Sequence, residues 1–236
     1  MHWSRSATAL AMALALQAFA QQQQPTQQTP PASAPRFVVV IDAAHGGDDT
    51  GAHLSSGQLE KTANLALSVR LRSLLTARGF QVVTTREDDS SIDLNRRAEL
   101  ANHANAAVCI TLHATESGSG VHLFESSLAP ANPTRFMPWK TAQAAWETRS
   151  LAFAGAVNSA LTHAGLTVTL GRIPLPAIES MTCPAIAVEL GPQRDADKKI
   201  TAESDNPDYQ TQVASALAAA VLEWRSDPNR TGARQP

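Results

Sequence analysis

Residues 37–47 read FVVVIDAAHGG, and this stretch decides the expected fold. Its first five residues form a continuous apolar run, which is typical of a strand buried on both faces of a parallel sheet. A glycine-rich loop follows, and then apolar residues recur with helical spacing over residues 59–78, after which Gly79 ends the pattern. The order strand, loop and helix predicts the first unit of an α/β fold.

The remainder of the chain alternates between the same two patterns. Further strands are predicted at residues 80–84, 107–112, 120–124, 166–170 and 185–188, and further helices at residues 92–104, 140–164 and 208–224. This alternation predicts a three-layer α/β fold, in which a mostly parallel central sheet of about six strands carries helices on both faces. We find no internal repeat, so residues 37–226 are expected to form one domain.

The N-terminal residues have the pattern of a secretory signal. Arg5 precedes an apolar run over residues 7–16, and residues 18–20 read AFA, which fits an A-x-A cleavage site. The apolar run is too short for a membrane anchor, which needs about 20 residues. We therefore expect a signal peptide over residues 1–20 and an exported protein without stable membrane insertion, located in the periplasm or in the cell wall or extracellular space.

Two further segments and the overall charge restrict the possibilities. Residues 21–36 are rich in Gln and Pro and are expected to be a disordered linker, and residues 227–236 a disordered tail. The formal net charge is −2, and there is no basic run long enough to suggest a nucleic-acid partner.

Cys109 and Cys183 are the only two cysteines in the chain. Both fall in or just before predicted core strands, where Cys commonly behaves as a small hydrophobic residue. They can form a disulfide only if these two strands are neighbours in the right register. Two buried free thiols are the state that we expect from the sequence, and no spacing of Cys and His suggests a structural metal site.

Four residues form the candidate functional site. His45 follows the first strand, His113 ends the third, Glu60 opens the first helix, and Glu189 ends the last strand. An open α/β sheet places its active site at the carboxyl ends of its strands, so these side chains are expected to lie close together. Two imidazoles and a carboxylate are the ligands of a catalytic zinc, and a further carboxylate suits the general base.

Each of these residues also has a structural explanation. Glu60 could complement the dipole of the helix that it begins, and Glu189 could form an exposed ion pair with Arg194. His45 alone could be an ordinary loop histidine, and His113 a core histidine whose hydrogen bonds are satisfied. His122 is a spare candidate ligand, because it begins the strand that follows the one ending in His113.

The segments IDAAHGG, GQLEKTANLAL, ITLHA and PAIAVELG together resemble the zinc-dependent N-acetylmuramoyl-L-alanine amidases, the cell-wall hydrolases of amidase family 3. The resemblance extends over residues 37–224. It implies a zinc amidase catalytic domain in which His45, Glu60 and His113 bind Zn²⁺ and Glu189 is the catalytic acid and base. The implied reaction is hydrolysis of the amide between N-acetylmuramic acid and L-alanine of the peptidoglycan stem peptide, in cell-wall remodelling or catabolism.

The resemblance extends to a TR…R…AN stretch, and it also has gaps. Arg86, Arg97 and Asn102 match that stretch, and we expect structural roles for them, with Arg86 beside the carboxylates that follow it. Departures from the family pattern place Ala44 where glycine is expected, Thr115 where asparagine is usual and Pro192 where an aromatic residue is usual. None removes a candidate ligand or the acid/base, so they bear on the substrate pocket and its stem-peptide specificity.

Two other functions are alternatives for the same residues. A zinc peptidase or deacetylase acting on another amide would use the same ligands and base, and only substrate profiling separates it from an amidase. A non-catalytic peptidoglycan-binding module is disfavoured because all four chemical residues are present.

Residues 127–138 bear on regulation. Division-associated members of the family carry an inserted helix here that blocks the zinc until a partner removes it. In this chain the segment contains three prolines and no acidic residue, which predicts no occluding helix. We therefore expect an open groove and no activator protein, with Trp139 either on the rim of the groove or packed on the following helix.

Overall fold

A computed structural model describes residues 37–132, 134 and 137–227 of the chain. The expected signal peptide and linker lie outside these residues, as does the expected tail apart from Asp227. Among the described residues, no helix has both the length and the apolar character that crossing a membrane requires.

The centre of the domain is a six-stranded sheet with the strand order β2-β1-β3-β6-β4-β5. All pairs of neighbouring strands are parallel except β4 and β6, which are antiparallel. The expected mostly parallel sheet is therefore confirmed. Its strands are β1 (Val38–Ala43), β2 (Gln81–Thr84), β3 (Val108–Ala114), β4 (Val121–Ser126), β5 (Val168–Ile173) and β6 (Ala185–Leu190).

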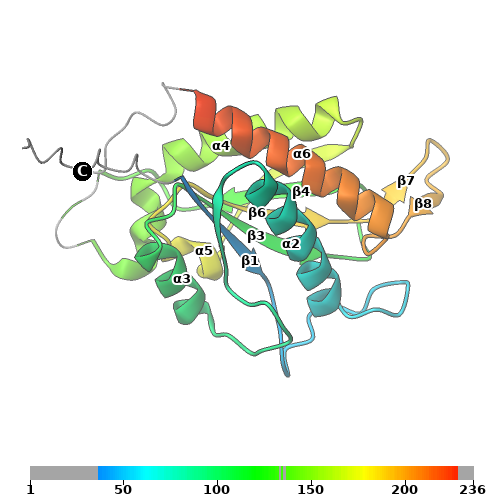
Figure 1. Cartoon of the computed structure of the whole chain (residues 1–236), viewed down its shortest axis with the longest axis horizontal. Helices are drawn as coiled ribbons and strands as arrows, with labels where there is room; N and C mark the ends of the chain where they lie inside the picture. The colour runs from blue at the N-terminus through cyan, green and yellow to red at the C-terminus, as the bar shows by residue number, and fades with distance from the viewer. Residues whose placement is uncertain (1–36, 133, 135–136, 228–236) are drawn as a thin grey trace, which may run out of the picture. The chain divides into compact units, whose positions relative to one another are not determined.

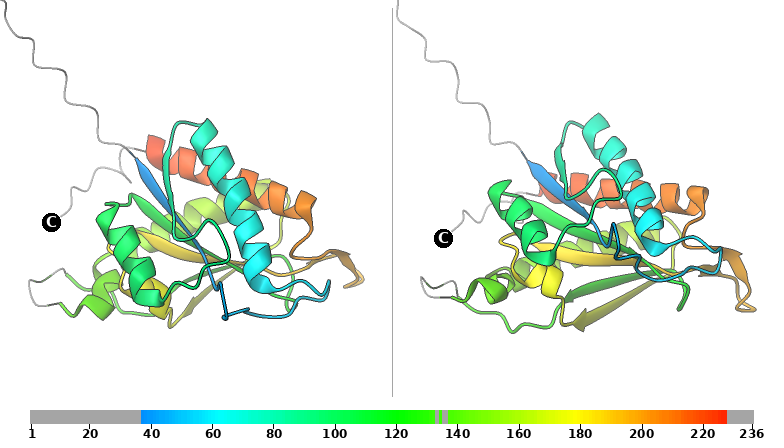
Figure 2. Two further views of the ribbon diagram at one scale, coloured as in Figure 1. Left: turned by 60° about the horizontal axis from the view of Figure 1, so that its bottom comes forward. Right: turned by 90° about the horizontal axis from the view of Figure 1, so that it is seen from below.

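Helices cover both faces of this sheet (Figures 1 and 2). One face packs against α2 (Glu60–Ala77), α4 (Glu147–His163) and α6 (Pro207–Ser226), and the other against α3 (Leu94–His103), the short α5 (Pro176–Glu179) and the 3-10 helix η1 (Trp139–Ala145). The sheet has an apolar core on each face, and successive residues of β1 point to opposite faces. Val39 and Ile41 belong to the larger core, whereas Val40 belongs to the smaller one.

Several boundaries differ from those expected. The predicted helix over residues 140–164 is two elements, because the backbone leaves helical geometry at Thr141 and Trp146 separates η1 from α4. The edge strand β5 begins and ends later than expected, since most of its residues are exposed and no apolar run marks it. The four-residue α5 and the small hairpin of β7 (Gln193–Arg194) and β8 (Ile200–Ala202) are too short to give a periodic pattern.

The expectation of two free thiols is wrong, because Cys109 and Cys183 form a disulfide. The two Cα atoms are 6.2 Å apart, within the usual range for a disulfide. Cys109 lies opposite Ala185 in the parallel pairing of β3 with β6, and Cys183 lies just before β6. The sequence could not give this result, because β4 and β5 lie between these two neighbouring strands along the chain.

Candidate metal centre

His45 is placed by a tightly held loop after β1. Its backbone has φ of 65°, a left-handed conformation that is uncommon for residues other than glycine. Two buried arginines hold the loop in this shape: Arg97 donates to the carbonyl oxygens of Ala43 and His45 at 2.8 and 2.7 Å, and Arg86 donates to Ala43 at 2.9 Å. The next residue must be glycine, because a Cβ on Gly46 would lie 2.3 Å from a backbone oxygen. The loop is thus fixed around the imidazole of His45.

Glu60 is the first residue of α2, and its carboxylate is buried, with 6% of the residue exposed. Oε2 accepts a hydrogen bond from the amide of Ala52 at 2.8 Å, and Oε1 accepts one from the amide of Ala114 at 3.3 Å. Asn64, one turn along the helix, donates to Oε1 at 3.4 Å. The carboxylate therefore has a fixed orientation, and the helix N-terminus favours its negative charge.

His45 and His113 both point at this carboxylate. Nε2 of His45 lies 3.1 Å from Oε1 of Glu60, and Nδ1 of His113 lies 2.8 Å from the same oxygen. The two imidazole rings meet edge to face, with their centroids 5.3 Å apart. One potential ligand atom from each of the three residues lies within 4.8 Å of the others. The expected convergence of His45, Glu60 and His113 is therefore present in the structure.

The charges at this centre fit a cation. Burial acts to raise the pKa of Glu60, but hydrogen bonds with His113 and His45 outweigh it and hold that pKa below its ordinary value. The hydrogen bond with Glu60 raises the pKa of His45, against the opposing effect of burial. When Nδ1 of His45 donates to Asp49 at 2.9 Å, Nε2 of a neutral ring presents its lone pair to the Glu60 carboxylate. Two electron-rich atoms face each other stably only with a proton or a metal cation between them.

Glu189 lies beside this group, on the neighbouring strand. It is the register partner of His113 in the pairing of β3 with β6, and of His122 in the pairing of β6 with β4. Its Oε2 lies 3.2 Å from Nδ1 of His122, so the exposed ion pair with Arg194 is not what the structure contains. Arg194 instead donates to the carbonyl oxygens of Gly118 and Lys198.

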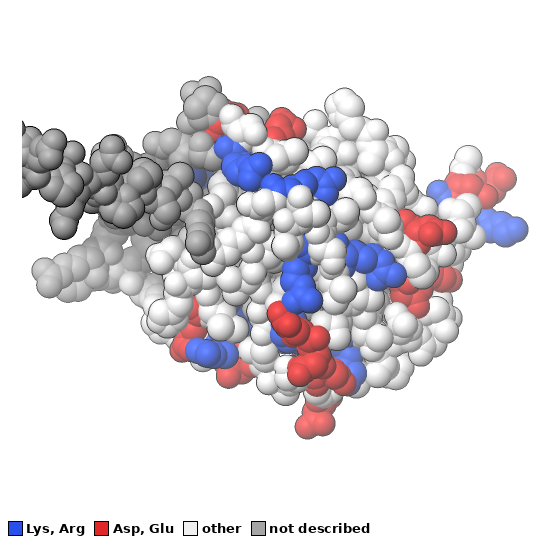
Figure 3. All heavy atoms as spheres, in the orientation of Figure 1, with Lys and Arg blue, Asp and Glu red and all other residues white. Residues whose placement is uncertain are grey.

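A cavity of about 320 Å³ opens beside His45 and His113. This volume is at the lower end of the range of small-molecule sites. Acidic side chains gather at the lower edge of the view in Figure 3, where the loops after β1 and β2 lie. Besides the two histidines, the cavity is lined by Asp42, Ala44, Gly46, Asp49, Ser91, Ile92, Asp93, Leu94, Arg97, Thr111 and Ala177.

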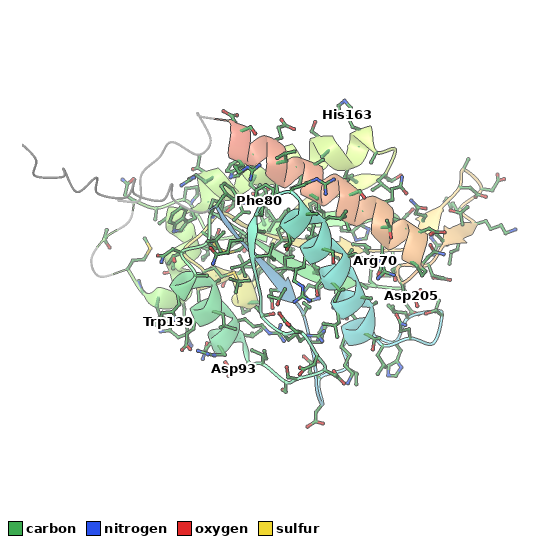
Figure 4. All side chains as sticks on the ribbon, viewed as in Figure 1. Arg70, Phe80, Asp93, Trp139, His163 and Asp205 are labelled. Carbon is green, nitrogen blue, oxygen red and sulfur yellow. A yellow bond between two sulfur atoms is a disulfide. The ribbon has the colours of Figure 1, made fainter. Side chains whose placement is uncertain are left out.

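Trp139 lies on the same side of the molecule as Asp93 and α3 (Figure 4). It is 53% exposed and lines a second cavity of about 210 Å³, which shares Leu94 with the first. Trp139 is therefore exposed at a different cavity from the one beside His45 and His113, and its place on the rim of the substrate groove stays a prediction. The described residues of segment 127–138 form neither helix nor strand.

The supporting residues of the TR…R…AN stretch have structural contacts. Arg86 donates to backbone carbonyl oxygens, among them that of Asp88. Asn102 joins α3 to the turn after α5 through Ser180 and Thr182. The family departure at Ala44 is tolerated, because its φ is not positive.

Three contacts around the candidate site had not been predicted. Arg97 forms a buried ion pair with Asp42 at 2.6 Å, and Asp49 orients His45. The third contact joins His122 to Glu189. The acidic residues beside the HGG motif were a usable signal for Asp49. The other two contacts depend on the packing of distant segments, which the sequence does not display.

Comparisons with known proteins agree with this geometry. A family model described as N-acetylmuramoyl-L-alanine amidase matches residues 39–223. N-acetylmuramoyl-L-alanine amidase AmiA of Escherichia coli (strain K12) is 39% identical over 82 residues, which is 35% of this chain and 28% of that protein. The sporulation-specific N-acetylmuramoyl-L-alanine amidase of Bacillus subtilis (strain 168) is 36% identical over 94 residues, which is 39% of this chain and 36% of that protein. The matched stretches thus span about a third of these two relatives.

Solved structures extend the comparison to whole domains. The catalytic domain of CwlV, an N-acetylmuramoyl-L-alanine amidase from Bacillus (Paenibacillus) polymyxa var. colistinus, has a TM-score of 0.61 and 28% identity over 80% of this chain and 98% of that chain. The apo form of Ami1 from Mycobacterium abscessus, at 22% identity and a TM-score of 0.64 over 82% of this chain and 100% of that one, shares the fold. Since the family model matches most of its length, the chain belongs to the N-acetylmuramoyl-L-alanine amidase family, Amidase_3.

Proposed function

We propose that the chain is an exported zinc amidase that hydrolyses the amide between N-acetylmuramic acid and L-alanine of the peptidoglycan stem peptide. The observation that carries this proposal is the convergence of His45 and His113 on the Glu60 carboxylate. Glu189 lies beside His113 on the adjacent strand. Membership of the family supports the choice of bond.

His45, Glu60 and His113 would hold the zinc ion. Two imidazoles and one carboxylate are a usual ligand set for catalytic zinc, which keeps a further position open. Asp49 and Asn64 act behind the ligands: the first fixes the tautomer of His45, and the second bonds to the Glu60 carboxylate. When bound, zinc would supply Lewis-acid chemistry, which acidifies water and polarises a carbonyl.

Glu189 would be the acid and base of the reaction. Adjacent strands lie about 4.8 Å apart, and Glu189 is the direct register partner of the ligand His113. Its side chain is 29% exposed, so it can meet water and substrate at the edge of the sheet. The carboxylate would accept the proton of the attacking water and return it to the departing amine of L-alanine.

Three observations support an exported location. The N-terminal sequence has the three-part pattern of a secretory signal. The Cys109–Cys183 disulfide suits an oxidising compartment such as the periplasm or the cell exterior. Peptidoglycan, the proposed substrate, lies outside the cytoplasmic membrane.

The proposed enzyme needs no activator. This part of the proposal is supported by the described residues of segment 127–138, which form no helix, and by the absence of acidic residues from the sequence of that segment. The purified zinc-loaded protein should therefore digest sacculi by itself. Folded, zinc-loaded protein that is silent until a second protein is added would contradict this part.

The test of the reaction is digestion of purified peptidoglycan followed by mass spectrometry of the soluble products. Free stem peptides beginning with L-alanine are the expected products, and Glu189→Gln is the matched control that should release almost none. Zinc content is measured on both proteins, with about one ion per chain expected. Cleavage elsewhere in the peptide, or loss of acetyl groups alone, would instead identify a peptidase or a deacetylase.

A further inference from the structure

We propose that His122 is a positioning residue for Glu189, holding the carboxylate in the orientation that proton transfer needs. The inference rests on the proposed function, because it assigns the acid and base to Glu189. His122 would act by donating its Nδ1–H to Oε2 of Glu189, which leaves the other carboxylate oxygen free for water.

The register of the sheet brings these residues together. His113, Glu189 and His122 are successive partners across β3, β6 and β4, so they form one row along the edge of the sheet. Side chains directly opposite each other on neighbouring strands project to the same face and are close enough to interact. Nδ1 of His122 lies 3.2 Å from Oε2 of Glu189, with 16% and 29% of the two side chains exposed. The contact is therefore partly shielded from water.

The imidazole of His122 is confined by the turn that precedes β4. A Cβ placed on Gly118 would lie 2.3 Å from Cε1 of His122, so the backbone closes over the ring. Arg194 holds this turn by donating its Nε to the carbonyl oxygen of Gly118 at 3.1 Å. The ring of Phe124 lies edge to face with the imidazole as well, with ring centroids 6.3 Å apart. His122 is thus a rigid donor on a β-strand, as an orienting residue should be.

A direct role in the metal centre does not fit His122. The convergent ligand atoms belong to His45, Glu60 and His113, and His122 is not among them. Its imidazole instead contacts the carboxylate proposed as the base, on the side of β6 away from β3. Free rotation of the general base slows the reaction, since a misplacement of about 1 Å can lower the rate on the order of 10²-fold. Fixing Glu189 is therefore a sufficient reason for a histidine here.

The test compares two polar replacements of His122. The amide nitrogen of Asn lies near the position of Nδ1, whereas that of Gln lies near the position of Nε2. His122→Asn should keep kcat within about threefold of the original protein, and His122→Gln and His122→Leu should lower kcat about 10- to 10²-fold, the cost of a misplaced group. KM and zinc content should stay unchanged. Similar losses in Asn and Gln variants that are both folded would overturn the inference.

A double-mutant cycle separates positioning from a general structural role. If His122 acts through Glu189, then His122→Leu should lower kcat much less in the Glu189→Gln protein than in the original protein. Equal losses in both backgrounds would show that His122 acts elsewhere. The Glu189→Gln protein also separates the proposed role of Glu189 from the proposed role of His122. Full activity of Glu189→Gln would overturn the acid and base assignment, whereas an inactive Glu189→Gln with a fully active His122→Leu would overturn only the inference about His122.

Discussion

The neighbouring strands β3 and β6 have opposite characters at their two ends. Near their beginnings, the disulfide of Cys109 with Cys183 joins them covalently. At their other ends they carry His113 and Glu189 in register, with 33% and 29% of these side chains exposed. One end is closed by a buried cross-link, and the other is open and partly exposed.

The closed end is held by hydrogen bonds as well as by the disulfide. Gln143 is fully buried and donates its side-chain amide to the carbonyl oxygens of Met181 and Cys183 at 3.0 and 3.1 Å. Ser150, also fully buried, donates to Gln143 and accepts from the amide of Ala185. The contacts of the closed end are thus structural, whereas the open end carries the proposed chemistry. We therefore expect substitutions at the two ends to affect different properties.

The largest effect is expected from His113→Ala at the open end. Loss of an imidazole should remove the bound zinc, and with it several kcal/mol of transition-state stabilisation, on the order of 10³-fold or more in rate. Metal content by elemental analysis and release of stem peptides measure the two losses. The thermal midpoint should match that of metal-free original protein. Full turnover in a variant without metal would contradict the zinc proposal.

Removal of the disulfide at the closed end should lower stability and leave activity unchanged. The disulfide spans 74 positions of sequence, and closing a loop of this length stabilises a folded chain by about 4 kcal/mol in the chain-entropy model. The double substitution Cys109→Ala/Cys183→Ala should therefore lower the free energy of unfolding by roughly that amount, as measured in urea. Activity per folded molecule should be retained. A fall in kcat without loss of stability would show that the two ends are coupled.

A smaller loss of stability is expected from Ser150→Ala. The substitution leaves the amide of Ala185 and the side-chain oxygen of Gln143 buried without their present partner. An unsatisfied buried polar group costs about 1 to 3 kcal/mol, so the urea midpoint should fall while turnover is unchanged. Thr211→Ala, at an exposed hydroxyl on α6, is the matched control, and it should change stability far less. Equal effects of the two substitutions would argue against a special role for the closed end.

Much of this organisation could be predicted from the sequence, and the exceptions share one physical cause. The apolar run before His45 indicates a buried parallel strand, and such a strand delivers its last residues to the carboxyl edge. That rule was enough to predict that His45, Glu60 and His113 would converge; their roles, and that of Glu189, stay predictions. The order of strands β3, β6 and β4 is set by tertiary packing and does not follow chain order. Both the disulfide and the contact of His122 with Glu189 depend on it.

The smallest expected effect on stability concerns Glu125, which belongs to neither end of β3 and β6. It lies on β4, 3% exposed, and its Oε2 has no hydrogen-bond partner among the described residues. Burial and the charge of Glu147 raise the pKa of Glu125 to about 6, against the opposing charge of Arg172. A carboxyl group whose pKa is higher in the folded than in the unfolded chain leaves the protein most stable below the unfolded value, and stability falls as pH rises through about 6.

Glu125→Gln should remove this penalty. The expected gain in the free energy of unfolding is about 1 to 2 kcal/mol at pH 8, from a shift of roughly one and a half pKa units. Urea denaturation at pH 8 and at pH 4 measures it, and the two proteins should differ at the higher pH and agree at the lower. If Glu125→Gln is instead less stable at pH 8, the charged carboxylate has a stabilising partner. Turnover should be unchanged in either case, because Glu125 lies outside the set of residues that converge on the proposed metal.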